Sequence, residues 1–297
     1  MWQQLTLRVR SAEAEPLEQQ LLDAGAVSIS YLDAEDQPVF QEEPGSTPLW
    51  DLSILLALFE ADHDLDTVVS ELKQNPLILN GDSLQIERLE DQAWERSWMQ
   101  DFKPMQFGRR LWICPSWDNS ADTAADNNAV TIMMDPGLAF GSGTHPTTGL
   151  CLEWLDQAEL QGLDVIDYGC GSGVLAIAAA LLGARQVIAV DNDPQAILAT
   201  LDNSQRNGIS LEQLHSYLPE ALPPLQADVL LANILAAPLQ ELAGHFATLL
   251  KPGARLVLSG LLENQISDVA ACYADQFNLA EPAIDGDWVR LDGVRKA

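Results

Sequence analysis

Hydrophobic and polar residues follow two different periods along the first 90 residues of the chain. Residues 2–9 alternate apolar and polar side chains, which is the period of a half-buried strand. Residues 11–24 place apolar side chains on one helical stripe, and we expect Ser11 to cap this helix and Gly25 to end it. Together with the later apolar segments, residues 1–90 predict strand, helix, strand, strand, helix and strand, the order of the ferredoxin-like split βαβ fold.

From Leu163 onward, the pattern alternates between short buried strands and amphipathic helices. This alternation predicts an α/β fold in which helices cover both faces of a parallel sheet. We expect residues 211–218 to supply the third strand, although the segment is polar. The other predicted strands and helices are, in order, 163–168, 174–182, 186–190, 194–207, 228–232, 238–250, 255–259, 263–276 and 288–291.

The two patterns divide the chain into three parts. Residues 1–90 show no catalytic spacing of side chains, so we expect them to form a substrate-recognition domain. Residues 91–105 predict a linker helix, and residues 106–297 form the larger α/β domain.

Composition places the chain among soluble globular proteins. Its 297 residues are 47% hydrophobic, and no apolar run approaches the roughly 20 residues of a membrane helix. The start of the chain lacks the features of a secretory signal. The four cysteines form no C-x-x-C pair and no zinc-like cluster with histidine, so we expect reduced thiols, no metal and a cytoplasmic location.

The net charge of −29 is spread along the whole chain. The first 100 residues carry 20 acidic and 5 basic side chains, and the rest carry 24 and 10. Such a surface repels phosphate backbones, so we expect no stable binding of nucleic acid. The charge either attracts a basic partner or serves solubility alone, and composition leaves both interpretations open.

A glycine-rich turn follows the buried strand that ends at Asp167. Gly169, Gly171 and Gly173 permit positive φ and a close approach of the backbone to a ligand, and the next helix begins at once. Dinucleotide sites use the spacing G-x-G-x-x-G, whereas this turn reads G-x-G-x-G and has an acidic residue two positions before its first glycine. The spacing therefore disfavours a nicotinamide oxidoreductase.

Two more polar residues stand at the carboxyl ends of predicted strands, where ligands of open α/β sheets bind. Asp191 ends the strand after the glycine-rich turn, and its carboxylate is suited to the ribose hydroxyls of an adenosine. Asn233 ends the fourth strand, where its side-chain oxygen can hold an amine. The alternative for Asn233 is a turn residue before the next helix.

A second glycine-rich loop, residues 135–148, runs into a helix with an apolar face. Thr144, Thr147 and Thr148 offer hydroxyl groups to a carboxylate of a ligand. His145 is a candidate proton acceptor, and the alternative is a histidine that orders the turn before Pro146.

These segments resemble the PrmA family, which methylates large-subunit ribosomal protein L11. The resemblance is carried by residues 135–148, 167–173, Asp191 and Asn233-Ile234-Leu235-Ala236, and it extends through the whole chain. It implies an N-terminal ferredoxin-like domain, a linker helix and a class I (Rossmann-like) methyltransferase domain that uses S-adenosylmethionine. One departure is Ser142, where the family more often has threonine.

The resemblance also implies an activity, namely N-methylation of lysine and N-terminal amino groups of ribosomal protein L11. It carries cofactor-binding roles onto Thr148, Gly169, Asp191 and Asn233. With the adjacent motif residues, we expect a donor site of Thr144, Thr148, Asp167, Gly169, Gly171, Gly173, Asp191 and Asn233, in which Asn233 and His145 are the candidate catalytic residues.

Two other functions remain possible at this point. A class I methyltransferase for a small molecule would use the same donor motifs, and a non-catalytic S-adenosylmethionine-binding module would keep the glycines and Asp191 but not the Asn233 region. We expect the enzyme to act as a monomer.

Overall fold

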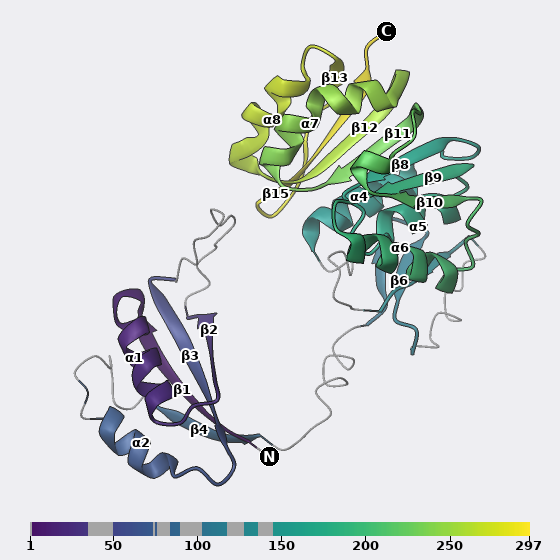
Figure 1. Ribbon diagram of the computed structural model, residues 1–297. Helices are drawn as coiled ribbons and strands as arrows, with labels where there is room; N and C mark the ends of the chain where they lie inside the picture. Colours follow the sequence, from purple (N-terminus) through teal and green to yellow (C-terminus); the bar gives the residue numbers. More distant parts are fainter. Residues whose placement is uncertain are drawn as a thin grey trace. The chain divides into compact units, whose positions relative to one another are not determined.

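The computed structural model describes residues 2–34, 50–73, 75, 84–89, 103–117, 128–135 and 145–297. The chain divides into two compact units, Met1–Asp101 and Phe102–Ala297 (Figure 1). Nearly all of the predicted linker helix over 91–105 lies outside the described residues, as does Thr144 with most of the loop 135–148.

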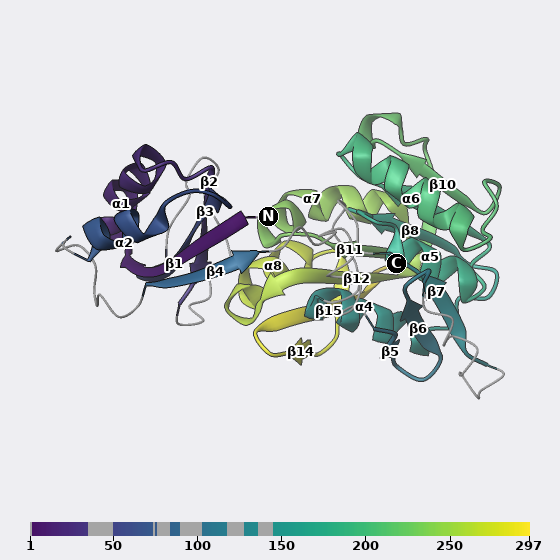
Figure 2. The same cartoon turned by 90° about the horizontal axis from the view of Figure 1, so that it is seen from below.

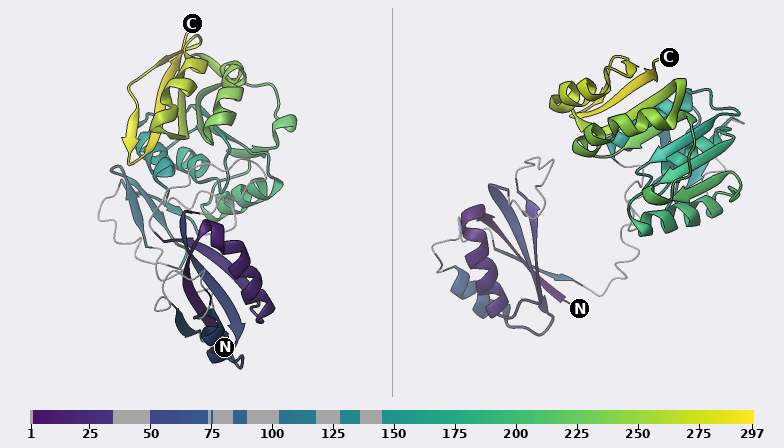
Figure 3. Two further views of the ribbon diagram at one scale, coloured as in Figure 1. Left: turned by 90° about the vertical axis from the view of Figure 1, so that its left-hand side faces the viewer. Right: turned by 45° about the horizontal axis from the view of Figure 1, so that its top comes forward.

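The first unit contains one antiparallel sheet with the strand order β2-β3-β1-β4. Its two helices lie on the same face of this sheet (Figure 3). The elements are β1 (Trp2–Arg10), α1 (Ser11–Asp23), β2 (Ser28–Asp33), β3 (Leu52–Glu60), α2 (Leu65–Leu72) and β4 (Gln85–Leu89), which is the predicted ferredoxin-like order.

Alternation along β1 and β3 creates the core of the first unit. Every second side chain, including Leu5, Leu7 and Leu55, is fully buried against α1 and α2. The expected cap at Ser11 is wrong: the helix begins at Ser11 itself, Arg10 occupies the cap position, and no side chain bonds to the first turn. The backbone N–H of Ser11 instead donates to the carbonyl of Asp51, which precedes β3, so a backbone hydrogen bond to this adjacent segment takes the place of a side-chain cap.

The second unit begins with a three-stranded sheet, β5-β6-β7, whose strands pack beside a helix. β5 and β6 are antiparallel, whereas β6 and β7 are parallel. The elements are β5 (Met105–Phe107), β6 (Leu111–Cys114), β7 (Val130–Met133) and α4 (Pro146–Gln157).

The main sheet of the second unit has the order β10-β9-β8-β11-β12-β15-β13, and β14 pairs with β15 at one end (Figure 2). The elements are β8 (Asp164–Tyr168), α5 (Val174–Leu181), β9 (Gln186–Val190), α6 (Pro194–Arg206), β10 (Leu214–Tyr217), β11 (Ala227–Asn233), α7 (Ala236–Leu249), β12 (Leu250–Leu262), α8 (Ile266–Tyr273), β13 (Phe277–Leu279), β14 (Ala283–Asp285) and β15 (Trp288–Arg295).

The sheet is parallel only from β10 to β12. The expectation of a wholly parallel sheet is therefore wrong at the far end, where β15 runs antiparallel to β12, β13 and β14. The reason lies in the connections: β14 and β15 are joined by the two residues Gly286 and Asp287, and so short a link permits only an antiparallel hairpin.

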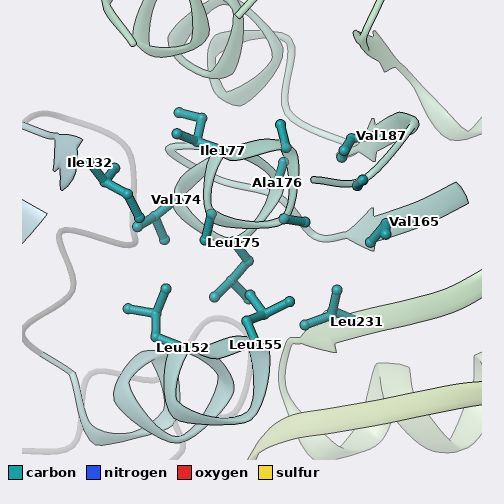
Figure 4. Close-up of a cluster of buried hydrophobic side chains, with 14 of the residues drawn as sticks. Ile132, Leu152, Leu155, Val165, Val174, Leu175, Ala176, Ile177, Val187 and Leu231 are labelled. Carbon is teal, nitrogen blue, oxygen red and sulfur yellow. The ribbon is translucent and has the colours of Figure 1, made fainter. Parts of the chain in front are cut away.

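Helices cover both faces of the sheet, and each face has its own core. On one face, α4 and α5 pack against inward side chains such as Val165, Val187 and Leu231 (Figure 4). On the other face, α7 and α8 cover the alternate residues, including Ile166 and Leu230. Because both faces are covered, the middle residues of β8, β9 and β11 are mostly apolar, as the sequence pattern predicts, and the polar residues stand mainly near the strand ends.

The two ends of the parallel strands differ in character. At the amino ends of β8, β11 and β12, charged side chains form an ion-pair cluster: Lys251 Nζ lies 2.8 Å from Asp228 Oδ1 and 3.5 Å from Asp164 Oδ2, and Arg185 Nε donates to Asp164 Oδ1 at 2.9 Å. At the carboxyl ends, the chain leaves β8 toward β9 and returns on its other side as β11. This change of direction is the place where open α/β sheets bind ligands.

Candidate functional site

A pocket of about 550 Å³ opens at the carboxyl ends of β8, β9 and β11. We call it the donor pocket. Five of the residues predicted from the sequence line it, namely Thr148, Gly169, Gly171, Asp191 and Asn233. Its volume lies in the range of small-molecule and cofactor sites.

Asp167 and Gly173 do not line the pocket. Asp167 lies in β8 before the glycine-rich turn, and Gly173 is the last residue of the turn before α5. Gly173 is the cap residue of α5 in the left-handed conformation, with φ of 83°. A Cβ atom there would lie 2.8 Å from Thr200 Cγ2, so the close packing of α6 also requires glycine.

Gly169 has φ of 82°, and a Cβ atom at this position would lie 2.2 Å from Cγ2 of Ile234. Ile234 follows β11, so glycine is required here because the β11–α7 connection rests on the turn. The positive φ expected from the sequence is present, and the contact with Ile234 is a further reason for glycine that the sequence did not indicate. The contact joins two walls of the donor pocket and fixes their separation.

The carboxylate of Asp191 is held by two backbone groups. Oδ2 accepts the N–H of Gly171 at 2.9 Å, and Oδ1 accepts the N–H of Asp193 at 3.0 Å. A carboxylate has about four acceptor positions, so each oxygen retains the capacity for a further hydrogen bond. The side chain is thus already oriented before any ligand hydroxyl reaches it.

Asp167 is only 1% exposed, and burial raises the pKa of its carboxyl group to about 7. The nearby charge of Asp191 raises this pKa further, whereas the N–H of Ala176, which donates to Oδ2 at 3.0 Å, lowers it. Within the described part of the chain, Oδ1 is buried and has no hydrogen-bond partner. The surroundings therefore favour the protonated form of this carboxyl group far more than water does.

On the opposite wall of the pocket, Asn233 Nδ2 donates to Thr148 Oγ1 at 3.3 Å. Thr148 is almost fully buried in the first turn of α4. Because the amide nitrogen is directed to Thr148, the amide oxygen of Asn233 is the group left to accept a hydrogen bond in the pocket.

His145 caps α4 and does not line the donor pocket. Its Nδ1 lies 2.7 Å from Thr147 Oγ1 and accepts the N–H of Thr147 at 3.3 Å. Its ring packs edge-to-face against Trp288 with 4.6 Å between the centroids, and partial burial lowers the pKa of the imidazole. This geometry favours the alternative interpretation, in which His145 orders the turn.

Sequence reasoning missed most of the apolar lining of the donor pocket. Ile234, Pro238 and Leu242 come from the β11–α7 connection and α7, and Pro219 follows β10. The sequence signal that could have identified Ile234 and Pro219 is their position just after predicted strands. Across the described residues, no group of three or more His, Cys, Asp or Glu side chains has the arrangement of a metal site.

Comparisons with known proteins agree with this arrangement. Residues 1–296 match the model of a family described as ribosomal protein L11 methyltransferase (PrmA). A protein of Pseudomonas putida (strain F1) named ribosomal protein L11 methyltransferase is 53% identical over 298 residues, covering 99% of each chain. A protein of the same name from Aliivibrio fischeri (strain MJ11) is 51% identical, again over 99% of each.

A solved structure gives the same result. The crystal structure of a ribosomal protein L11 methylase from Lactobacillus delbrueckii subsp. bulgaricus superposes with a TM-score of 0.60 at 31% sequence identity. The match covers 66% of this chain and all of the other. The resemblance found in the sequence motifs is confirmed, and the chain belongs to the PrmA family of ribosomal protein L11 methyltransferases.

Proposed function

We propose that this protein transfers methyl groups from S-adenosylmethionine to amino groups of ribosomal protein L11, namely lysine side chains and the N-terminal amine. The observation that carries the proposal is the donor pocket at the point between β8 and β11, where Asp191 and the glycine-rich turn face the Thr148–Asn233 pair. Family membership identifies the methyl acceptor.

The donor pocket fits S-adenosylmethionine in its chemistry. Asp191 has acceptor capacity for the two ribose hydroxyls, and the apolar side chains of Ile234, Pro238 and Leu242 suit the adenine ring. Gly169 and Gly171 line the pocket without side chains, so a ligand can approach their backbone closely. S-adenosylmethionine supplies a methyl group on a positively charged sulfur that accepts the electrons of the broken bond.

The chain's own task is to deliver a neutral amine. A free lysine has a pKa of about 10.4, and transfer from water into a partly apolar pocket lowers the pKa of the amine. The amide oxygen of Asn233 is placed to accept an N–H of the incoming amine and to aim its lone pair, while Thr148 fixes the amide. The proton released by the amine goes to water, since His145 Nδ1 is engaged by Thr147.

The first unit is proposed to recognise the substrate. The described residues that line the donor pocket all belong to the second unit, and the charge of the first 100 residues is strongly negative, which favours encounter with a basic protein. None of the described helices is long and apolar enough to cross a membrane. We propose that the enzyme works as a cytoplasmic monomer without a stable nucleic-acid partner.

The test is direct methylation in solution. Purified protein is incubated with unmethylated ribosomal protein L11 and radiolabelled S-adenosylmethionine, and the product is mapped by mass spectrometry. We expect label on lysine side chains and on the N-terminal amine, and much less with the Asp191→Ala variant. Labelling of small-molecule amines in the absence of any label on the ribosomal protein would overturn the proposal.

A further inference from the structure

A second cavity of about 570 Å³ lies on the other side of the first turn of α4. We call it the acidic groove. It shares no lining residue with the donor pocket, yet the two are adjacent along the chain: Thr148 lines the donor pocket, and Pro146 and Gly149 line the groove. A molecule in the groove therefore lies against the same helical turn that holds Thr148.

The acidic groove is formed by three elements. β5 and β14 both contact α4 and supply its two sides (Figure 2). The absence of a side chain at Gly149 lets the ring of Phe107 approach α4, since a Cβ atom there would lie 3.3 Å from Phe107 Cε1. Trp288 pairs with Asp285 across the hairpin, and its ring contacts His145, so the side formed by β14 is fastened to the start of α4.

The side chains of the groove combine apolar surface with negative charge. Phe107, Pro146 and Leu150 supply the apolar part, and the exposed carboxylates of Glu153 and Asp285 supply the charge. Within the described residues, neither carboxylate forms an ion pair. Arg290, which donates to the carbonyl of Leu150, is already paired with Asp292.

This combination matches one kind of side chain. Lysine has a long aliphatic stem and a terminal ammonium group, so it buries apolar surface while its charge reaches acidic groups or an aromatic face. We propose that the acidic groove binds a lysine side chain of the methyl-accepting protein other than the lysine being methylated, and so positions the acceptor segment beside the donor pocket. The inference rests on the proposed function.

The experiment neutralises both carboxylates in the full chain, as Glu153→Gln/Asp285→Asn. We expect the KM for ribosomal protein L11 to rise roughly three- to tenfold at low salt, because two exposed ion pairs are lost. The kcat and the affinity for S-adenosylmethionine stay unchanged. The rise in KM shrinks at about 0.5 M salt, because salt screens exposed charges.

The matched control is Glu212→Gln/Asp275→Asn, which removes the same charge from two exposed carboxylates that do not line the groove. We expect this control to leave KM near its original value. Equal KM values for the two double variants would overturn the inference, as would a fall in kcat alone, because that result places the methylated lysine itself in the groove. Failure of the unaltered enzyme to methylate the ribosomal protein would instead contradict the proposed function.

Discussion

At the scale of single residues, two carboxylates near the donor pocket have opposite surroundings. Asp191 is held by the N–H groups of Gly171 and Asp193 at the pocket wall, whereas Asp167 is buried behind the wall with one oxygen lacking a partner in the described residues. The sequence analysis predicts both as cofactor-binding residues of one donor site, at the ends of two successive strands. Only the structure separates a carboxylate that lines the pocket from one that is buried beneath the turn.

We expect Asp191→Ala to weaken S-adenosylmethionine binding by at least about tenfold, because hydrogen bonds to a charged group contribute roughly 1.5–3 kcal/mol each. Calorimetric titration measures the affinity. The matched control is Asp193→Asn, which removes a neighbouring charge but keeps a residue type that caps α6 equally well. Unchanged affinity in the alanine variant would show that Asp191 does not hold the donor.

The raised pKa of Asp167 predicts that the free energy of unfolding depends on pH. Its pKa in the folded protein, about 7, lies above the ordinary value of 3.8. Folding therefore favours the protonated form of Asp167. Its contribution to the free energy of unfolding is fully present below pH ~4 and is lost as the pH rises through 7. Each unit of difference corresponds to about 1.4 kcal/mol, so the loss is on the order of 4 kcal/mol.

Denaturant unfolding of the ligand-free protein between pH 4 and pH 8 measures this loss. The unaltered protein should lose stability relative to Asp167→Asn over this range, since the variant has no group to ionise at the site. Parallel pH profiles for the two proteins would contradict the assignment.

At the scale of elements, the donor pocket depends on a contact between two connections. Gly169 in the β8–α5 turn lies under Ile234 in the β11–α7 connection. We expect Gly169→Ala to weaken S-adenosylmethionine binding by at least about tenfold, because the new Cβ atom displaces Ile234 and a positive φ costs about 1–2 kcal/mol with a side chain.

A double variant separates the two causes. Gly169→Ala/Ile234→Ala removes the obstructing methyl group and should bind the donor more tightly than Gly169→Ala, although less tightly than the unaltered protein. Ile234→Ala alone provides the baseline. If the double variant shows no recovery, the contact with Ile234 does not explain the glycine.

Much of this architecture could be predicted from periodicity. β8, β9 and β11 have the apolar runs of buried parallel strands. Asp191 and Asn233 could be predicted as site residues because they stand where such strands end. β13 and β14 could not be predicted, because each has only three residues, too few to show the period of a strand. The predicted helix over 263–276 is a short 3₁₀ turn followed by α8, which ends at Tyr273.

The contacts that shape the site were beyond sequence reasoning for a different reason. Gly169 and Ile234 are 65 positions apart in the sequence and meet only after the sheet has formed. Periodicity reports which face of an element is buried and carries no information about which residue of another element covers it. The pairing of Asn233 with Thr148 is a second example.

At the scale of the whole molecule, the two compact units predict separable properties. A chain that begins at Asp91 retains all residues that line the donor pocket and should bind S-adenosylmethionine with the affinity of the full chain. It should lose methylation of intact ribosomal protein L11, because orienting one amine at the donor depends on the missing unit.

Donor affinity and methyl transfer are measured for both chains at two salt concentrations. The activity of the full chain should fall at the higher concentration if charge assists encounter. Methylation of the ribosomal protein by the shorter chain at the full rate would contradict a recognition role for the first unit.

The ion-pair cluster of Lys251, Asp228, Asp164 and Arg185 stands at the edge of the sheet opposite the donor pocket. It joins the starts of β8, β11 and β12, while the opposite ends of β8 and β11 form part of the donor pocket. The ion pairs that join strand starts and the residues that line the donor pocket therefore stand at opposite ends of β8 and β11. In laboratory evolution toward a heat-resistant methyltransferase, we therefore expect substitutions among the charged residues at the amino ends of these strands to change stability and to leave the geometry of the donor pocket unaltered.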